Sequence, residues 1–131
     1  SSAASDVYKR QMLTRTSRGR IYRSDSSDEG ETWCRAYRTK MPNNNSGIDL
    51  VLAGNGKIYL VCNPVKKNWG GRSPLDLLVS EDGGETFNLL MRLEDREGGE
   101  FSYPAITELG GVLHITYTYD REYIAYRQIK I

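Results

Sequence analysis

Two copies of one short pattern constrain what this chain can fold into. The pattern is Ser-x-Asp-x-Gly-x-Thr followed directly by an aromatic residue. Its members are Ser26, Asp28, Gly30, Thr32 and Trp33 in the first copy, and Ser80, Asp82, Gly84, Thr86 and Phe87 in the second. The two copies start 54 residues apart. A repeat of roughly 50 residues in a chain rich in strand signals is typical of β-propeller blades.

The residue types of the pattern suit a tight turn. Ser and Asp side chains accept hydrogen bonds from nearby backbone N–H groups, and Gly adopts a positive φ without steric cost. The aromatic residue after Thr is expected to pack beneath the blade. We therefore predict that both copies are structural and take no part in chemistry.

Strand signals dominate the rest of the sequence. We expect ten short strands, over residues 12–16, 20–26, 33–39, 48–53, 57–63, 75–80, 86–93, 101–109, 112–119 and 123–131. Asn55-Gly56 between two apolar runs is the strongest hairpin signal. No segment has a helical apolar stripe, so the predicted fold is all-β.

The length limits the architecture. A six-bladed propeller with this repeat needs roughly 300 residues or more, and the chain has 131. We expect a partial six-bladed β-propeller, with about two and a half blades of four-stranded antiparallel sheet. Residues 12–131 would be the C-terminal part of a larger β-propeller domain, and missing N-terminal blades of the same protein would be their partner. Residues 1–11 contain a run, residues 6–11, that looks like a translated sequencing adapter, and we interpret them as an artefact.

Composition excludes several functions. The formal net charge is +1, and leaving out residues 1–11, with two basic and one acidic residue, brings it to zero. We therefore expect no nucleic-acid partner, and without an apolar run near 18 residues no membrane span. A single histidine, His114, and two cysteines, Cys34 and Cys62, provide no metal-binding spacing. We expect no metal and no cofactor, and both cysteines to be buried free thiols.

The repeated pattern resembles the Asp box of the sialidase (neuraminidase) superfamily, in its divergent sialidase-like branch. Three further residues match that family's motifs by their place around the two boxes. Arg15 lies in Leu-Thr-Arg-Thr-Ser before the first box, and Arg72 lies in Gly-Arg-Ser-Pro-Leu before the second. Tyr103 lies in Phe-Ser-Tyr-Pro-Ala-Ile after it. The resemblance covers residues 12 to about 126, and it implies that residues 12–131 are the C-terminal part of a sialidase-like β-propeller domain.

The resemblance implies an exo-glycoside hydrolase that removes terminal sialic acid or a related acidic sugar. It implies that Arg15 and Arg72 bind the carboxylate, that Asn45 contacts the substrate from its loop, and that Tyr103 is the nucleophile. Arginine binds a carboxylate bidentately through its planar fork. A carboxylate nucleophile would be repelled by the carboxylate of the substrate. At a separation of 4 Å and an effective dielectric near 20, this repulsion is about 4 kcal/mol. A tyrosine nucleophile avoids that repulsion, and sialidases are the known case.

The sequence departs from the family pattern in three ways. The family's first arginine, its acid–base aspartate and its glutamate would lie upstream of residue 12, so this part alone is not expected to turn over substrate. Thr118 stands where many sialidases have a glutamate, and Pro104 stands where Ser is more common.

Two alternatives therefore stay open: a non-catalytic Asp-box propeller that binds a glycan or protein, and a sister hydrolase with another substrate. A glycan partner implies an extracellular or periplasmic location.

Overall fold

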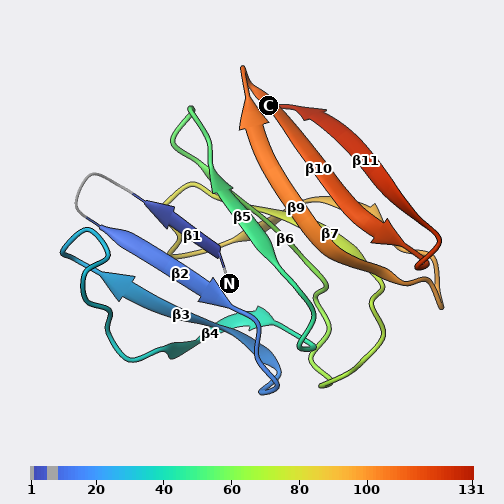
Figure 1. Ribbon diagram of the computed structural model, residues 1–131, viewed down its shortest axis with the longest axis horizontal. Helices are drawn as coiled ribbons and strands as arrows, with labels where there is room; N and C mark the ends of the chain where they lie inside the picture. The colour runs from blue at the N-terminus through green and yellow to red at the C-terminus, as the bar shows by residue number, and fades with distance from the viewer. Residues whose placement is uncertain (1, 6–8) are drawn as a thin grey trace.

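The computed structural model describes residues 2–5 and 9–131, with side chains from residue 9 onward (Figure 1). Within these residues every regular element is a strand. The strands are β1 (Ser2–Ser5), β2 (Arg10–Thr14), β3 (Arg20–Ser26), β4 (Tyr37–Pro42), β5 (Asp49–Leu52), β6 (Ile58–Cys62), β7 (Leu75–Ser80), β8 (Asn88–Glu94), β9 (Phe101–Leu109), β10 (Val112–Tyr119) and β11 (Tyr123–Lys130). The all-β prediction is confirmed.

The strands form three antiparallel sheets. Two have four strands, in the orders β1-β2-β3-β4 and β5-β6-β7-β8, and the third has three, in the order β9-β10-β11. Each sheet is a meander in which sequential strands pair. The first strands of the sheets, β1, β5 and β9, lie next to one another (Figure 1). This arrangement is that of successive propeller blades around a common axis.

Apolar residues fill the spaces between neighbouring sheets. One core joins the first two sheets and includes Leu13, Ile21 and Leu60, all fully buried. A second core joins the second and third sheets and includes Leu77, Phe101 and residues of β10. Strand β6 is buried along its whole length because it faces both cores. The three sheets therefore hold one another in fixed positions.

Four strands, β3, β7, β9 and β10, have the predicted bounds. Strand β1 was not predicted. Among the ten predicted strands, the largest difference is β4, which begins at Tyr37 and not at residue 33. Of the missing residues, Trp33 still belongs to the first Asp box and donates from Nε1 to the Gly30 carbonyl, and the Cys34 N–H donates to the Asp25 carbonyl outside the strand ladders. As a result Cys34 lies outside any strand and is exposed, so the prediction that it is buried was wrong. Cys62 is buried and free, as predicted.

Strand β1 and the start of β2 fall within residues 1–11. Ser2–Ser5 pair with residues 10–13 in the first sheet, and the Gln11 side chain donates to the Gly83 carbonyl at 2.6 Å. Positions 1 and 6–8, which include half of the adapter-like run, lie outside the described residues. The interpretation of this segment as an artefact stays a proposal.

Both Asp boxes adopt the same hydrogen-bonded turn. In the second box, Ser80 Oγ donates to Asp82 Oδ1 at 2.8 Å and accepts from the Gly84 N–H at 2.8 Å. The Thr86 N–H donates to Asp82 Oδ1 at 2.9 Å, and its hydroxyl donates to Oδ2 at 2.5 Å. Gly84 has φ +92°, as the turn requires, and a Cβ there would clash with the side-chain amide of Gln11. The first box repeats these bonds through Ser26, Asp28, Gly30 and Thr32.

These turns predict a defined loss of stability in acid. Hydrogen bonds, first from Thr32 and Thr86 respectively, lower the pKa values of Asp28 and Asp82 to about 2. Because the folded-state pKa lies below the unfolded value, the ionised form stabilises the fold above about pH 4, and this contribution is lost as pH falls towards 2. Asp82→Asn should therefore lower the melting temperature at pH 6, and the difference from wild type should narrow by pH 2.

Thermal melting followed by circular dichroism between pH 6 and pH 2 measures this difference in melting temperature. The control is Glu31→Gln, which replaces an exposed carboxylate of the first box. A difference for Asp82→Asn that is constant over this range would contradict the role given to the ionised carboxylate.

Candidate functional site

The loops at one end of the three sheets bring together the residues predicted to bind substrate. Arg15 follows β2, Asn45 precedes β5, Arg72 precedes β7, and Tyr103 lies near the start of β9. The Asp boxes follow β3 and β7 and therefore lie at the opposite end, because neighbouring strands are antiparallel. Each sheet thus contributes one of Arg15, Arg72 and Tyr103 to this end, which we call the arginine end.

Arg72 and Tyr103 are in direct contact. The Arg72 guanidinium carbon lies 5.0 Å from the centre of the Tyr103 ring, within the range of a cation–π interaction. The Arg72 side chain is only 14% exposed, whereas Tyr103 is 59% exposed. The Arg72 carbonyl also accepts from the Phe101 N–H at 2.9 Å, which ties its loop to β9. The guanidinium is therefore held in place, and the phenol faces solvent.

A β-bulge in β9 directs the Tyr103 side chain out of its sheet. Thr116 pairs with Ala105 and Thr118 pairs with Ser102, so β9 has one residue more than β10 over this stretch. Tyr103 has φ +51°, an uncommon value for a bulky residue. Pro104 fits here because a bulge tolerates a residue without an N–H group. Bulges redirect side chains next to active sites, and this one explains why Tyr103 points towards Arg72.

Arginines lower the pKa of the Tyr103 phenol. The largest cause is hydrogen bonding by Arg72, followed by the charge of Arg72, and Arg15 and Arg121 contribute further. Positive charge favours the phenolate over the phenol. A tyrosine that ionises more readily is a better nucleophile at neutral pH.

Arg15 and Asn45 form the other side of the site. Arg15 Nε donates to Asn45 Oδ1 at 3.3 Å, and Asn45 has φ +65°. Gly47 lies against the tyrosine, because a Cβ at this position would be 3.5 Å from Tyr103 Cδ1. The loop that carries Asn45 therefore touches both Arg15 and Tyr103.

Buried asparagines hold these loops together, and sequence reasoning gave them no such role. Asn43 is fully buried, and its Oδ1 accepts from the Thr16 N–H at 2.9 Å and the Asn45 N–H at 3.0 Å. Asn44 is 2% exposed and donates to the Gly71 carbonyl at 2.9 Å. The first bond fixes the Arg15 turn to the loop of Asn45, and the second fixes that loop to the segment before Arg72.

Asn63 completes the framework. It is fully buried, and its Nδ2 donates to the Pro74 carbonyl at 2.9 Å and the Phe101 carbonyl at 3.0 Å. Its Oδ1 accepts from Ser46 Oγ at 3.0 Å. One amide therefore links the loop after β6, the start of β7, the start of β9 and the loop before β5.

A cleft of 370 Å³ adjoins Arg72 at the same end. Its wall includes Asn44, Trp69, Arg72, Glu100 and Arg121, with glycines between them. Trp69 is 70% exposed with φ +59°. Sequence reasoning missed Glu100 and Arg121, because charged residues in a loop and a hairpin turn are usually solvated.

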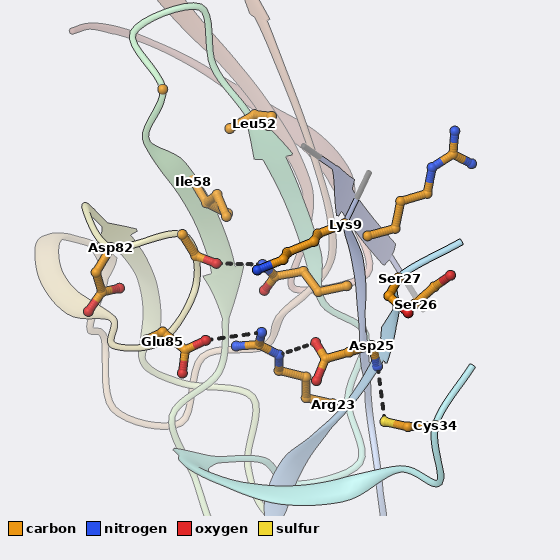
Figure 2. A pocket seen from close by; sticks show the side chains of 14 residues that line it. Lys9, Arg23, Asp25, Ser26, Ser27, Cys34, Leu52, Ile58, Asp82 and Glu85 are labelled. Carbon is orange, nitrogen blue, oxygen red and sulfur yellow. Dashed lines mark hydrogen bonds and ion pairs between the residues drawn. The ribbon is translucent and has the colours of Figure 1, made fainter. Parts of the chain in front are cut away.

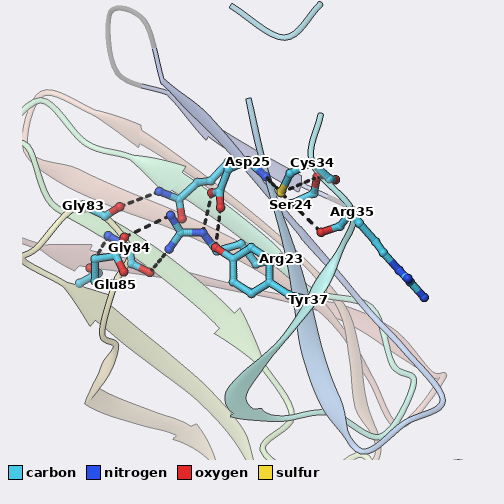
Figure 3. Close-up of polar contacts among 11 residues, drawn as sticks. Arg23, Ser24, Asp25, Cys34, Arg35, Tyr37, Gly83, Gly84 and Glu85 are labelled. Carbon is cyan, nitrogen blue, oxygen red and sulfur yellow. Dashed lines mark hydrogen bonds and ion pairs between the residues drawn. The ribbon is translucent and has the colours of Figure 1, made fainter. Parts of the chain in front are cut away.

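A larger cavity of 1180 Å³ lies at the Asp-box end, between the first two sheets (Figure 2). Arg23 crosses it, with Nε 2.7 Å from Asp25, Nη2 3.3 Å from Glu85 and Nη1 donating to the Gly84 carbonyl at 2.8 Å (Figure 3). The Tyr37 hydroxyl donates to the same Asp25 carboxylate at 2.5 Å. These groups bond to one another across the two sheets, so we interpret this cavity as part of the contact between blades.

The described residues contain no group of three or more His, Cys, Asp or Glu side chains placed to hold a metal ion. No helix among residues 2–5 and 9–131 is long and apolar enough to cross a membrane.

Comparison with known proteins defines the class. The NanB sialidase of Streptococcus pneumoniae superimposes over 98% of this chain with a TM-score of 0.78 at 16% identity, and the match spans 23% of that enzyme. The intramolecular trans-sialidase of Ruminococcus gnavus matches over 98% of the chain and 32% of its own length, with a TM-score of 0.71 at 18% identity. The α-L-arabinofuranosidase Arb93A of Fusarium graminearum matches over 92% and 41%, with a TM-score of 0.65 at 13% identity. The fold is that of sialidase-type propeller blades.

The BNR repeat-like domain family matches residues 3–115. The chain therefore belongs to this family. A search of curated proteins found no match. The chain spans less than half the length of each of these three solved structures.

Proposed function

We propose that this chain forms part of the substrate site of a glycoside hydrolase that removes a terminal sialic acid or a related acidic sugar. Arg15 and Arg72 bind the carboxylate, Asn45 holds Arg15 and contacts the sugar, and Tyr103 is the nucleophile in the whole protein. The single observation that carries the proposal is the stacking of the Arg72 guanidinium on Tyr103 at 5.0 Å. It puts a bidentate anion binder beside a phenol that is exposed to solvent.

The chemistry requires this combination. The anomeric carbon of a sialic acid bears a carboxylate, which the arginines would orient. The Tyr103 oxygen attacks that carbon as the bond to the leaving group breaks. The phenolic proton passes to a base, and the leaving-group oxygen takes a proton from the family's acid–base aspartate. The product is a glycosyl-tyrosine, which water then hydrolyses. The family's base would lie upstream of residue 12.

Substrate affinity tests this proposal through Arg72. Arg72→Lys keeps the charge but loses the planar fork, so affinity for sialic acid should fall roughly 10- to 100-fold, the equivalent of about 1.5–3 kcal/mol for a charge-assisted hydrogen bond. Titration of the protein with sialic acid, followed by NMR, measures the change. Arg35→Lys, an exposed arginine at the Asp-box end, is the matched control and should bind like wild type. Equal affinity for wild type and Arg72→Lys would remove Arg72 from the site.

The second candidate function is a non-catalytic propeller that binds an acidic glycan. Thr118, in place of the family's glutamate, is the residue that favours it. Under this alternative the whole protein binds sialic acid through Arg15 and Arg72 but hydrolyses no sialoside. A sister hydrolase for another acidic sugar would instead show turnover in a screen of several acidic glycosides.

A further inference from the structure

Arg121 lies where it can control Arg72, although no family motif predicts it. It belongs to the turn between β10 and β11, which the Glu122 N–H closes on the Tyr119 carbonyl at 3.0 Å. Its Nε donates to Glu100 Oε1 at 2.8 Å, and both residues line the cleft beside Arg72. The third sheet thus supplies a cation as well as the tyrosine.

Glu100 lies between two arginines. The same oxygen, Oε1, is 2.8 Å from Arg121 Nε and 4.0 Å from Arg72 Nη1. The second distance is at the outer limit of an ion pair, so Glu100 is bonded to Arg121 and only near Arg72. A carboxylate this close is also a competitor, because it resembles the acidic group that Arg72 is proposed to bind.

The backbone around this pair is fixed. The Glu100 N–H donates to Asp120 Oδ1 at 2.8 Å, and the Glu100 carbonyl accepts from the Asp120 N–H at 2.7 Å. Asp120 and Arg121 have φ +52° and +57°, in a turn where Asn-Gly would be the usual pair. Strained non-glycine residues cluster at functional sites, and this strain places Arg121 against Glu100.

We propose that Arg121 is a positioning residue of the acidic-sugar site, which holds Glu100 away from Arg72 and so leaves the Arg72 guanidinium available to the substrate's acidic group. This inference rests on the proposed function. Without Arg121, the nearest remaining cation for Glu100 among the described residues is Arg72. An ion pair between Glu100 and Arg72 would then keep the substrate's acidic group from binding Arg72.

A double-mutant cycle tests it, with sialic acid as the probe and NMR titration as the measurement. Arg121→Ala should lower affinity about 10-fold, because Glu100 then pairs with Arg72. Glu100→Gln should bind at least as tightly as wild type. The double variant Arg121→Ala/Glu100→Gln should recover to within about 3-fold of wild type. Arg121→Lys, which keeps a cation for Glu100, should lose less than Arg121→Ala. Glu122→Ala in the same turn is the control and should not change affinity.

Two results would overturn the inference. Unchanged affinity in Arg121→Ala would show that Glu100 does not compete. If affinity falls in Arg121→Ala and adding Glu100→Gln does not restore it, Arg121 either touches the sugar itself or supports the fold, and it does not act by restraining Glu100.

A second readout needs no ligand. Arg72, Arg15 and Arg121 lower the pKa of the Tyr103 phenol, and Glu100 Oε1 lies 4.0 Å from Arg72 Nη1. Arg121→Ala should move Tyr103 ionisation to higher pH. Loss of the direct charge of Arg121 gives the same part of this shift with or without Glu100, so the shift should be larger in the presence of Glu100 than in the Glu100→Gln background, where no carboxylate remains to pair with Arg72. NMR of ring-labelled tyrosine, assigned with Tyr103→Phe, follows this. If wild type binds no sialic acid, the proposed function fails, and the tyrosine titration still decides whether Arg121 controls the Glu100–Arg72 pair: an Arg121→Ala shift of equal size with and without Glu100→Gln would reject that control.

Discussion

Tyr103→Phe is expected to abolish turnover of a sialoside by the whole protein while leaving sialic acid affinity within about 3-fold of wild type. The phenol oxygen is needed only as the bond-forming atom, and the ring that stacks on Arg72 is kept. Loss of a nucleophile lowers kcat by roughly three orders of magnitude or more. Steady-state kinetics with a fluorogenic sialoside measure turnover, and NMR titration measures binding.

Tyr126→Phe is the matched control for this prediction. Tyr126 is also an exposed strand tyrosine, 54% accessible, and its hydroxyl bonds only to groups outside the arginine end. This variant should turn over like wild type. Near-normal kcat in Tyr103→Phe would make Tyr103 a binding or packing residue and end the nucleophile proposal.

The largest effect on stability should come from Asn63. Asn63→Ala removes an amide that is fully buried and leaves the Pro74 and Phe101 carbonyls without this donor, whereas the Ser46 hydroxyl keeps its bond to Asn44 Oδ1. A buried polar group left unsatisfied costs about 1–3 kcal/mol. We expect the free energy of unfolding to fall by about 2–4 kcal/mol, measured by urea denaturation.

Asn88→Ala, on the exposed strand β8, is the control and should change the free energy of unfolding by less than about 0.5 kcal/mol. The Asn63 prediction also concerns the site, because the Asn63 amide links the loops of Arg72 and Tyr103. A folded Asn63→Ala protein should therefore bind sialic acid more weakly. A variant as stable as wild type would mean that water or another group replaces the amide, and that the asparagines are not the framework of the arginine end.

The sequence predicted the blades well because their signals are local. The two Asp boxes, the Asn55-Gly56 hairpin and the alternating strands each depend on a few neighbouring residues, and β3, β7, β9 and β10 have the expected bounds. The error at β4 is also local: Trp33 has a strand-forming side chain, but its indole N–H bonds within the Asp-box turn.

The arginine end was less predictable, because it depends on contacts between sheets. The resemblance named Arg15, Arg72 and Tyr103, and the structure brings them to one end. The bulge that turns Tyr103 outward appears only when β9 pairs with β10. Asn63 was predicted only as the last residue of a strand, and its partners lie up to 38 positions away in the sequence. Arg121 looked like a solvated turn residue because its partner Glu100 is 21 positions away and on another loop.

The nucleophile claim can be tested directly by trapping the covalent intermediate. The whole protein would be incubated with a fluorinated sialosyl fluoride, which forms the glycosyl-enzyme faster than water removes it, and the peptides would be mapped by mass spectrometry. The account predicts one added sugar on Tyr103 in wild type and none in Tyr103→Phe. An adduct on any other residue, or a protein that binds sialic acid and hydrolyses a sialoside without ever modifying Tyr103, would contradict it.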